Sequence, residues 1–367
     1  MIVVGAGITG RCAAWWLARR GARVTLLDQH GLDHARGSSH GRSRITRSAY
    51  ADAAYVRLMQ VAHQEAWPAL EADAGVALRH PRTGCIFGPV DGPLATYAAA
   101  LAEAGLPTAI HVGADARARF PGFRFPAGVG ALADPSAAVI AAADTLDALA
   151  GLLRDRCQLR MGVRVHAVDP VAPAVETDAG RLVADRVVVA AGPWATRLFP
   201  ALQPRLTPVR QQVAYVDVPD AAAFPVWIWA DPDAVFYGLP AFQRPGLKAA
   251  RHRVQGTADD PDADGTRDLG DVLAFLRAQL AVPVGDLVGT ETCFYTNTDD
   301  EDFLVDHHPA GPGVVVGLGL SGHGFKFGPL LGRILAELAL DGHTSVAAFE
   351  AERARFAWGA HADGPGR

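Results

Sequence analysis

Alternation of apolar and polar positions divides the first part of the chain into two short strands and a helix. An apolar strand at residues 2–4 runs into a glycine-rich turn, and a helical segment at residues 11–20 follows and stops at Gly21. A second apolar strand at residues 23–27 ends at Asp28. This order predicts one βαβ unit at the start of the chain.

Beyond this unit, helix-like and strand-like segments follow one another without strict alternation. Helices are predicted at residues 60–74, 92–104, 137–154, 272–280 and 329–340. Strands are predicted at residues 163–168, 174–177, 186–191, 212–218, 235–239, 290–296 and 313–318, with a hairpin turn at 178–180. This mixture favours a nucleotide-binding α/β layer with an inserted, more antiparallel domain.

Composition and charge narrow the class of protein. Of the 367 residues 50% are hydrophobic and 20% charged, which is ordinary for a globular protein of about two domains. A net charge of -5 gives no electrostatic reason to expect nucleic acid or an anionic membrane as partner. No apolar run approaches the roughly 20 residues that span a bilayer, and the N-terminus has no signal-peptide pattern.

The cysteines and histidines do not suggest a metal site. The four cysteines are scattered without a CxxC pair, so we expect reduced thiols and a cytoplasmic protein. His307 and His308 are adjacent on a predicted strand and therefore point to opposite faces, which indicates structural roles.

The turn Gly5-Ala6-Gly7-Ile8-Thr9-Gly10 has the GxGxxG pattern of a dinucleotide site, in the context that such a site requires. It follows a strand and opens a helix. The first glycine permits the tight turn, the second a close approach to pyrophosphate, and the third close helix–strand packing. The helix N-terminus offers N–H donors to phosphate, and Asp28 could accept hydrogen bonds from a ribose.

This motif does not distinguish NAD from FAD, but a later segment favours FAD. Residues 186–194 form an apolar strand that runs into a Gly192-Pro193-Trp194 turn, as in many two-domain flavoproteins. The predicted fold is therefore α/β (α+β), with a Rossmann-type FAD-binding domain and an interleaved antiparallel-sheet substrate domain. The expected boundaries are 1–80, 135–205 and 300–367 for the FAD-binding domain, and 81–134 and 206–299 for the substrate domain.

Several separated blocks then resemble one family in the right order. They are the N-terminal fingerprint and the segments Ser39-His40-Gly41-Arg42-Ser43-Arg44-Ile45-Thr46-Arg47-Ser48-Ala49-Tyr50, Phe236-Tyr237-Gly238-Leu239-Pro240, Gly246-Leu247-Lys248-Ala249-Ala250-Arg251-His252, Cys293-Phe294-Tyr295-Thr296 and Ser321-Gly322-His323-Gly324-Phe325-Lys326-Phe327. The chain resembles the D-amino-acid-oxidase-type FAD-dependent oxidoreductases, and within them the monomeric sarcosine oxidase and N-methyltryptophan oxidase family.

The resemblance implies a role for each matched residue. Cys293 would be joined through sulfur to the 8α-methyl group of the flavin, and Arg47 with Lys326 would hold the substrate carboxylate. Lys248 would support the reaction of reduced flavin with oxygen, because a fixed cation stabilises developing superoxide. Lys248 and Lys326 are the only two lysines of the chain, and both fall on functional positions of the family.

The remaining site residues also follow from the resemblance. Lys248, Arg44, His252 and Tyr237 would be catalytic, whereas Arg47, Lys326, Tyr237, Ile228 and Trp229 would bind substrate. Trp227 and Trp229 could stack on an aromatic or cyclic substrate or belong to the core. The residues expected to contact FAD are Gly5, Gly7, Ile8, Thr9, Gly10, Asp28, Gln29, Ser39, His40, Arg44, Val165, Gly192, Trp194, Cys293, Tyr295, Gly319, Ser321, Gly322, His323, Gly324, Phe325 and Lys326.

The expected activity is oxidation of a small secondary amino acid, N-methyl or cyclic, to an imine, with reduction of oxygen to hydrogen peroxide. The chain is expected to act as a monomer. Three alternatives stay open: a dehydrogenase of the same fold that uses another acceptor, an amine oxidase of specialised metabolism, and a non-catalytic flavin-binding protein.

Overall fold

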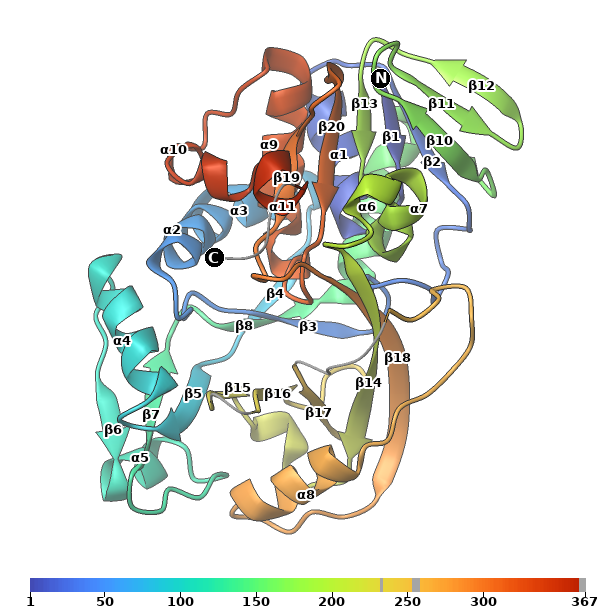
Figure 1. Ribbon diagram of the computed structural model, residues 1–367. Coiled ribbons are helices and arrows are strands. Elements are labelled where there is room, and N and C mark those ends of the chain that lie inside the picture. Colours follow the sequence, from blue (N-terminus) through green and yellow to red (C-terminus); the bar gives the residue numbers. More distant parts are fainter. Residues whose placement is uncertain (232–233, 253–257, 363–367) are drawn as a thin grey trace.

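Two large sheets, one above the other in Figure 1, organise the molecule. The structure, a computed structural model, describes residues 1–231, 234–252 and 258–362. The upper sheet consists of β19 (Leu304–His308), β20 (Gly311–Leu318), β13 (Val187–Val189), β1 (Ile2–Val4), β2 (Val24–Asp28) and β9 (Cys157–Met161), in this spatial order. All neighbouring strands in it are parallel except β19 and β20.

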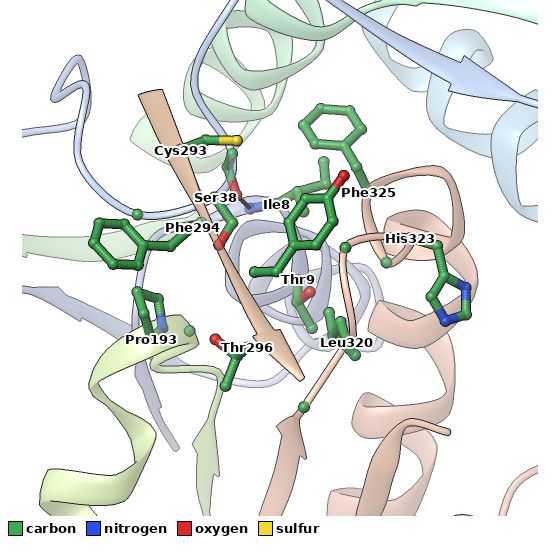
Figure 2. A pocket seen from close by; sticks show the side chains of 18 of the residues that line it. Ile8, Thr9, Ser38, Pro193, Cys293, Phe294, Thr296, Leu320, His323 and Phe325 are labelled. Carbon is green, nitrogen blue, oxygen red and sulfur yellow. Dashed lines mark hydrogen bonds between the residues drawn. The ribbon is translucent and has the colours of Figure 1, made fainter. Parts of the chain in front are cut away.

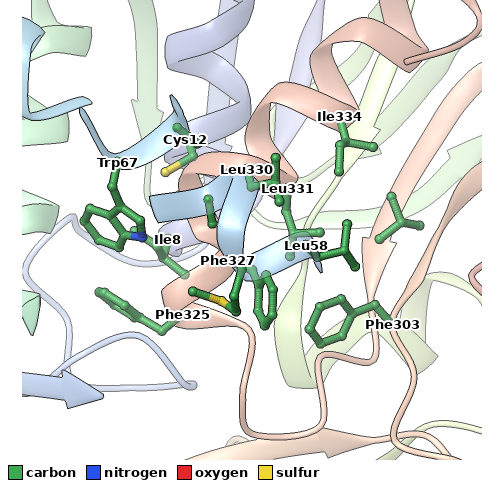
Figure 3. Packing of buried hydrophobic residues seen from close by; sticks show 14 of the residues in the cluster. Ile8, Cys12, Leu58, Trp67, Phe303, Phe325, Phe327, Leu330, Leu331 and Ile334 are labelled. Atoms are coloured by element: carbon green, nitrogen blue, oxygen red, sulfur yellow. The ribbon is translucent and has the colours of Figure 1, made fainter. Parts of the chain in front are cut away.

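Three helices cover one face of this sheet: α1 (Ile8–Arg19), α6 (Ala142–Arg154) and α9 (Gly328–Asp341). Helix α9 packs directly on α1 at Gly332. The helices are so close there that a methyl group on Gly332 would lie only 2.5 Å from Cys12 Cβ. Figure 3 shows Cys12 close to Leu330 and Leu331, with Trp67 beside them. Further contacts come from α2 (Ala53–Val61), the π-helical turn η1 (Ala62–Ala66) and α3 (Trp67–Ala74).

The opposite face is covered by smaller elements. A three-stranded sheet of β10 (Val165–Asp169), β11 (Ala174–Thr177) and β12 (Gly180–Val183) packs there, with η2 (Gly192–Trp194), α7 (Ala195–Leu198), η3 (Pro200–Leu202) and α11 (Trp358–Ala362) nearby. The central strands β1 and β13 are buried on both faces and entirely apolar, as is usual for parallel sheets, whereas the edge strands β9 and β19 contain polar, only half-buried residues.

The lower sheet is mainly antiparallel. Its eight strands are, in spatial order, β18 (Leu287–Asn297), β14 (Thr207–Val216), β17 (Leu247–Arg251), β16 (Phe236–Leu239), β15 (Val226–Trp229), β5 (Gly84–Pro89), β7 (Val129–Asp134) and β6 (Ile110–Val112). Only β15 and β5 pair in parallel. The other helices of this half are α4 (Pro93–Glu103), α5 (Gly113–Arg119), η4 (Ala221–Ala223) and α8 (Gly270–Gln279).

A third, small sheet lies between the two large ones in Figure 1 and consists of β3 (Ser43–Thr46), β8 (Ala138–Ala141) and β4 (Arg79–Pro81). The C-terminal part of the chain adds η5 (Phe325–Phe327), α10 (Ala347–Glu350) and η6 (Arg353–Arg355). Of the helices in the described ranges, none is long and apolar enough to cross a membrane.

The predicted α/β fold with a Rossmann-type sheet is confirmed. One predicted helix is wrong in part: residues 137–154 begin with strand β8, and helix α6 starts only at Ala142. The buried run Ala138-Val139-Ile140-Ala141 pairs with both β3 and β4, and a short apolar run does not distinguish strand from helix. The domain boundaries remain a prediction.

Candidate active site

A cavity of about 890 Å³ lies between the two large sheets. Its walls combine the N-terminal glycine turn, the 36–50 segment, strands β14, β17 and β18, and the loop that precedes α9. Figure 2 shows part of this wall, with Cys293 and Thr296 of β18 and Ile8 and Thr9 of α1 among the residues that line the cavity. Its volume is at the upper end of the range for small-molecule and cofactor sites.

The glycine turn at one end has the close contacts that the sequence pattern requires. Gly5 has a φ of +97°, and a side chain there would overlap the carbonyl of Ala190. A methyl group at Gly10 would likewise overlap the carbonyl of Gly5. Gly10 therefore permits the packing of helix on strand and does not line the cavity, whereas Gly5, Gly7, Ile8 and Thr9 do.

Polar groups around this turn are arranged to receive a nucleotide. Ser39 Oγ accepts a hydrogen bond from Ile8 N at 3.1 Å, which ties the 36–44 segment to the start of α1. Asp28 accepts from Ala6 N at 2.6 Å and from His30 N at 2.8 Å, and its carboxylate lines the cavity. Gln29, Val165, Gly192 and Trp194 line the same end. These residues fit the adenosine and pyrophosphate parts of FAD.

Near the middle of the cavity, Cys293 lies among cationic groups. Burial raises the pKa of its thiol, whereas the charges of Arg44 and Lys248 act in the opposite direction. The ring of Tyr295, two residues along β18, packs against Gly322, where any side chain would collide with it. Gly319, Gly324 and Phe325 line the cavity beside them.

Lys248 is buried, and its ammonium donates to Ser43 O at 2.9 Å. Burial and, next, the nearby Arg44 lower the pKa of Lys248 to about 7. His40 Nε2 lies 2.8 Å from Thr292 O, while its buried Nδ1 has no hydrogen-bond partner among the described residues. Such an unpartnered buried polar atom indicates a ligand at this point.

Arg47 and Lys326 form a second cationic group. Arg47 is 9% exposed and Lys326 is 6% exposed, and neither forms an ion pair with a described residue. The Arg47 guanidinium lies 4.2 Å from the Tyr50 ring centre, and its buried Nη1 has no partner in the described part of the chain. Burial, followed by Arg47, lowers the pKa of Lys326 well below its usual value. Two buried cations without a counter-ion make an anion site.

Aromatic groups lie beside these cations. Tyr295 OH donates to Tyr237 OH at 3.2 Å, and the His252 ring centre lies 5.6 Å from that of Tyr295. His323 Nδ1 lies 3.2 Å from Tyr50 OH, and its Nε2 lies 3.1 Å from Glu301 O. All five side chains line the cavity.

Trp229 and Ser321, which the sequence analysis assigned to the substrate and the cofactor, do not line the cavity. Ile228 lines the cavity, but Trp229 and Trp227 point to the opposite face of β15, where Trp227 is fully buried against Phe275. Alternation along a strand separates residue 228 from its neighbours. Ser321 is also turned away, with its Oγ accepting from Thr298 N at 3.1 Å.

His307 and His308 have structural surroundings. The ring nitrogens of His307 lie 3.1 Å from Pro312 O and 3.3 Å from Gly342 O. His308 packs on Trp358 with ring centres 4.6 Å apart.

The sequence analysis missed two residues that line the cavity, Glu291 and Tyr97, and also Tyr215, which does not line it but donates a hydrogen bond to Glu291. Glu291 lies two positions before Cys293, so strand alternation could have identified it as a neighbour on the same face. Tyr97, from α4, lies with its ring centre 5.8 Å from the Arg47 guanidinium. Nothing in the local sequence of Tyr215 or Tyr97 indicates these contacts.

Comparisons with known proteins identify the family of the chain. Residues 1–338 match the DAO family, described as FAD dependent oxidoreductase. The chain is 36% identical over 359 residues to peroxisomal sarcosine oxidase of Homo sapiens, covering 92% of this chain and 91% of the relative. It is 31% identical over 362 residues to monomeric sarcosine oxidase of Bacillus sp. (strain B-0618), covering 94% and 93%.

Among solved structures, the open form of NikD, described as an unusual amino acid oxidase essential for nikkomycin biosynthesis, matches with a TM-score of 0.80 and 28% identity. The match covers 94% of each chain. The match over residues 1–338 and the tight glycine turn at the start of α1 together show that the chain belongs to the DAO family of FAD-dependent oxidoreductases.

Proposed function

We propose that this protein is an FAD-dependent oxidase of a small secondary amino acid, N-methyl or cyclic, that produces an imine and hydrogen peroxide. The observation that carries the proposal is the buried pair Arg47 and Lys326, which has no ion-pair partner among the described residues and lines the same cavity as the FAD cradle. A substrate carboxylate is the group that this pair would bind.

FAD, when bound, would supply the oxidant for a hydride from the carbon next to nitrogen; the nitrogen loses its N–H proton as the imine forms, and the two electrons and two protons together reduce oxygen to hydrogen peroxide. The chain would orient the amino acid through Arg47 and Lys326. Tyr237 and His252 would face the amine, which reacts as the neutral base, and Ile228 would form part of the wall around the substituent.

Two finer assignments belong to the same proposal. Cys293 would form the thioether to the flavin, supported by its place on the cavity wall among Arg44 and Lys248. Lys248 would present its ammonium to oxygen, supported by its burial and by its side-chain hydrogen bond to Ser43 O, the only one that its Nζ donates within the described residues. A monomeric state and a cytoplasmic location remain predictions of the sequence.

A peroxide screen under air tests the proposal. Sarcosine, other N-methyl amino acids, and cyclic imino acids such as proline and pipecolate would be compared with the matching amines that lack a carboxylate. We expect peroxide with at least one secondary amino acid and little with its decarboxylated counterpart. Bleaching of the flavin without peroxide would instead identify a dehydrogenase, and no bleaching by any compound would contradict the enzymatic assignment.

A further inference from the structure

A carboxylate outside the family blocks lies at the middle of the cavity. Glu291 stands two residues before Cys293 on β18, and alternate residues of a strand share a face. Glu291, Cys293 and Tyr295 all line the cavity. The Glu291 side chain is 21% exposed, so its charge is only partly screened by water.

Both oxygens of this carboxylate are held in place. Tyr215 OH donates to Glu291 Oε2 at 2.7 Å, and Arg244 Nη1 donates to Oε1 at 2.7 Å. The Arg244 guanidinium also stacks on Tyr215, 4.0 Å from the ring centre. Partial burial opposes ionisation of Glu291, but the hydrogen bond from Tyr215 and the charge of Lys248 outweigh it and lower the pKa of the carboxyl.

The cations that Glu291 faces compete for one acceptor. Lys248 Nζ and Arg44 Nη1 each donate to Ser43 O at 2.9 Å, so two positive charges meet at one carbonyl. Neither forms an ion pair within 4.0 Å with a carboxylate in the described ranges. Two like charges this close favour loss of a proton from the group with the lower pKa, which here is the Lys248 ammonium and not the guanidinium of Arg44.

Glu291 is placed to oppose this repulsion. Tyr215 is the cross-strand partner of Lys248, whose Nζ lies 5.7 Å from the Tyr215 ring centre. On the other side, a methyl group built at Gly41 would lie 3.0 Å from Glu291 Oε2 and 3.2 Å from Arg44 Nη1. The carboxylate therefore lies near Arg44 Nη1 and, across Tyr215, near Lys248, and it forms no ion pair within 4.0 Å with either cation.

The charged and titratable groups around Lys248 come from every neighbouring element. They are Arg44 from β3, Tyr215 from β14, Glu291 and Cys293 from β18, Tyr237 from the paired strand β16, and Arg244 from the loop before β17. Burial and the two arginines lower the pKa of Lys248, whereas Glu291 and the Cys293 thiolate raise it. A thioether at Cys293 carries no charge. In the holoprotein Glu291 is therefore the nearby group that raises the pKa of Lys248.

We propose that Glu291 is the counter-charge of the Arg44–Lys248 pair, a positioning residue that increases the protonated share of Lys248 near neutral pH. This inference rests on the proposed oxidase function, in which that ammonium faces oxygen. Glu291 itself contacts Tyr215 and Arg244 and acts through Lys248.

The chain allows a direct test because it has only two lysines. In holoprotein labelled with 13C at lysine Cε, two signals are expected, and K248M assigns them. E291Q should move the titration midpoint of the Lys248 signal to lower pH by about one unit or more, and leave the Lys326 midpoint unchanged. E291D, which keeps the charge, should recover most of the shift.

The matched control is E176Q, which removes an exposed carboxylate paired with Arg181 on the β11–β12 hairpin. It should move neither midpoint. An unchanged Lys248 midpoint in E291Q would overturn the inference. Equal shifts of both lysine signals would also overturn it, since they would report a general change in structure.

Reoxidation kinetics separate this inference from the proposed function. Oxygen is mixed with the reduced holoprotein across a pH series, and anaerobic reduction by substrate serves as the reference step. We expect E291Q to slow reoxidation near pH 7 by about fivefold and to regain speed on acidification, with the pH dependence of reduction unaltered. If the Lys248 midpoint moves but the reoxidation profile does not, the charge coupling stands and the oxygen role of Lys248 in the proposed function fails.

Discussion

At the scale of single residues, the cavity combines two buried cationic groups with different surroundings. Lys248 and Arg44 share the carbonyl of Ser43, with Glu291 beside them. Arg47 and Lys326 have aromatic rings and backbone carbonyls around them and no carboxylate ion pair among the described residues. The first group is therefore internally balanced, whereas the second needs an anion from outside.

Arg47→Ala should mainly weaken binding of carboxylate substrates. Loss of a charge-assisted pair of hydrogen bonds corresponds to about 1.5–3 kcal/mol, or roughly a 10- to 100-fold rise in KM, with a smaller effect on kcat. Binding of a carboxylate inhibitor, followed by the flavin spectrum, provides an independent measurement. Arg47→Lys keeps the charge but not the planar guanidinium, so its KM should lie between those of the wild type and the alanine variant. Unchanged affinity in the alanine variant would refute the carboxylate role.

Cys293→Ser should leave the fold intact and release the flavin. The thiol is a small group on the cavity wall, so the hydroxyl that replaces it should be tolerated. After acid precipitation, yellow colour should stay with the wild-type pellet and appear in the supernatant of the variant. Free flavin from the wild-type protein would contradict the thioether.

At the scale of elements, strand alternation decides which side chains reach the site. Along β15, Ile228 faces the cavity while Trp227 and Trp229 pack in the core below. Along β18, Glu291, Cys293 and Tyr295 share one face and line the cavity, and Phe294 and Thr296 near the end of the strand line it as well. The sequence motif identified the strand in each case, but the register of the neighbouring strands determined the face.

Close packing of α9 on α1 predicts a contrast between two glycines. In Gly332→Ala the new methyl group would lie 2.5 Å from Cys12 Cβ, and the two helices would have to separate, at a cost of about 1–3 kcal/mol. Gly151, in α6, has no atom within 4 Å of such a methyl group, so Gly151→Ala should be neutral or stabilising by up to about 1 kcal/mol. Urea unfolding of both variants measures the difference. Equal stabilities would show that α9 can shift without loss.

At the scale of the whole molecule, the loop at residues 259–268 of the lower half is hydrogen-bonded to the upper half. Asp262 accepts from Trp194 Nε1 at 2.8 Å and from Arg197 Nη1 at 2.5 Å. Trp194 lines the nucleotide end of the cavity, so this loop braces that end from outside. Burial raises the pKa of Asp262, but the hydrogen bonds from Arg197 and Trp194 outweigh it, and the net pKa is lowered.

Asp262→Ala should loosen this loop. Loss of hydrogen bonds worth about 1 kcal/mol should raise the rate of protease cleavage within residues 259–268 about fivefold. Asp264→Ala is the matched control, because Asp264 is 97% exposed and lies 3.8 Å from Arg36. Since the folded pKa of Asp262 is depressed, its stabilising contribution is present above its usual pKa of 3.8 and is lost only below it. Equal cleavage of both variants would contradict the bracing role.

Local sequence alone determined the βαβ start, the glycine cradle and the apolar strands of the upper sheet, because each depends on nearest neighbours and a simple period. Resemblance in separated blocks added the family and most residues of the site. Tertiary structure decided that residues 138–141 are a strand, because β3 and β4 supply hydrogen bonds on both sides. It also decided that Trp229 leaves the cavity and that Glu291 lies beside Lys248. Those facts depend on which strands pair and in what register, and residues far apart in the chain fix that register.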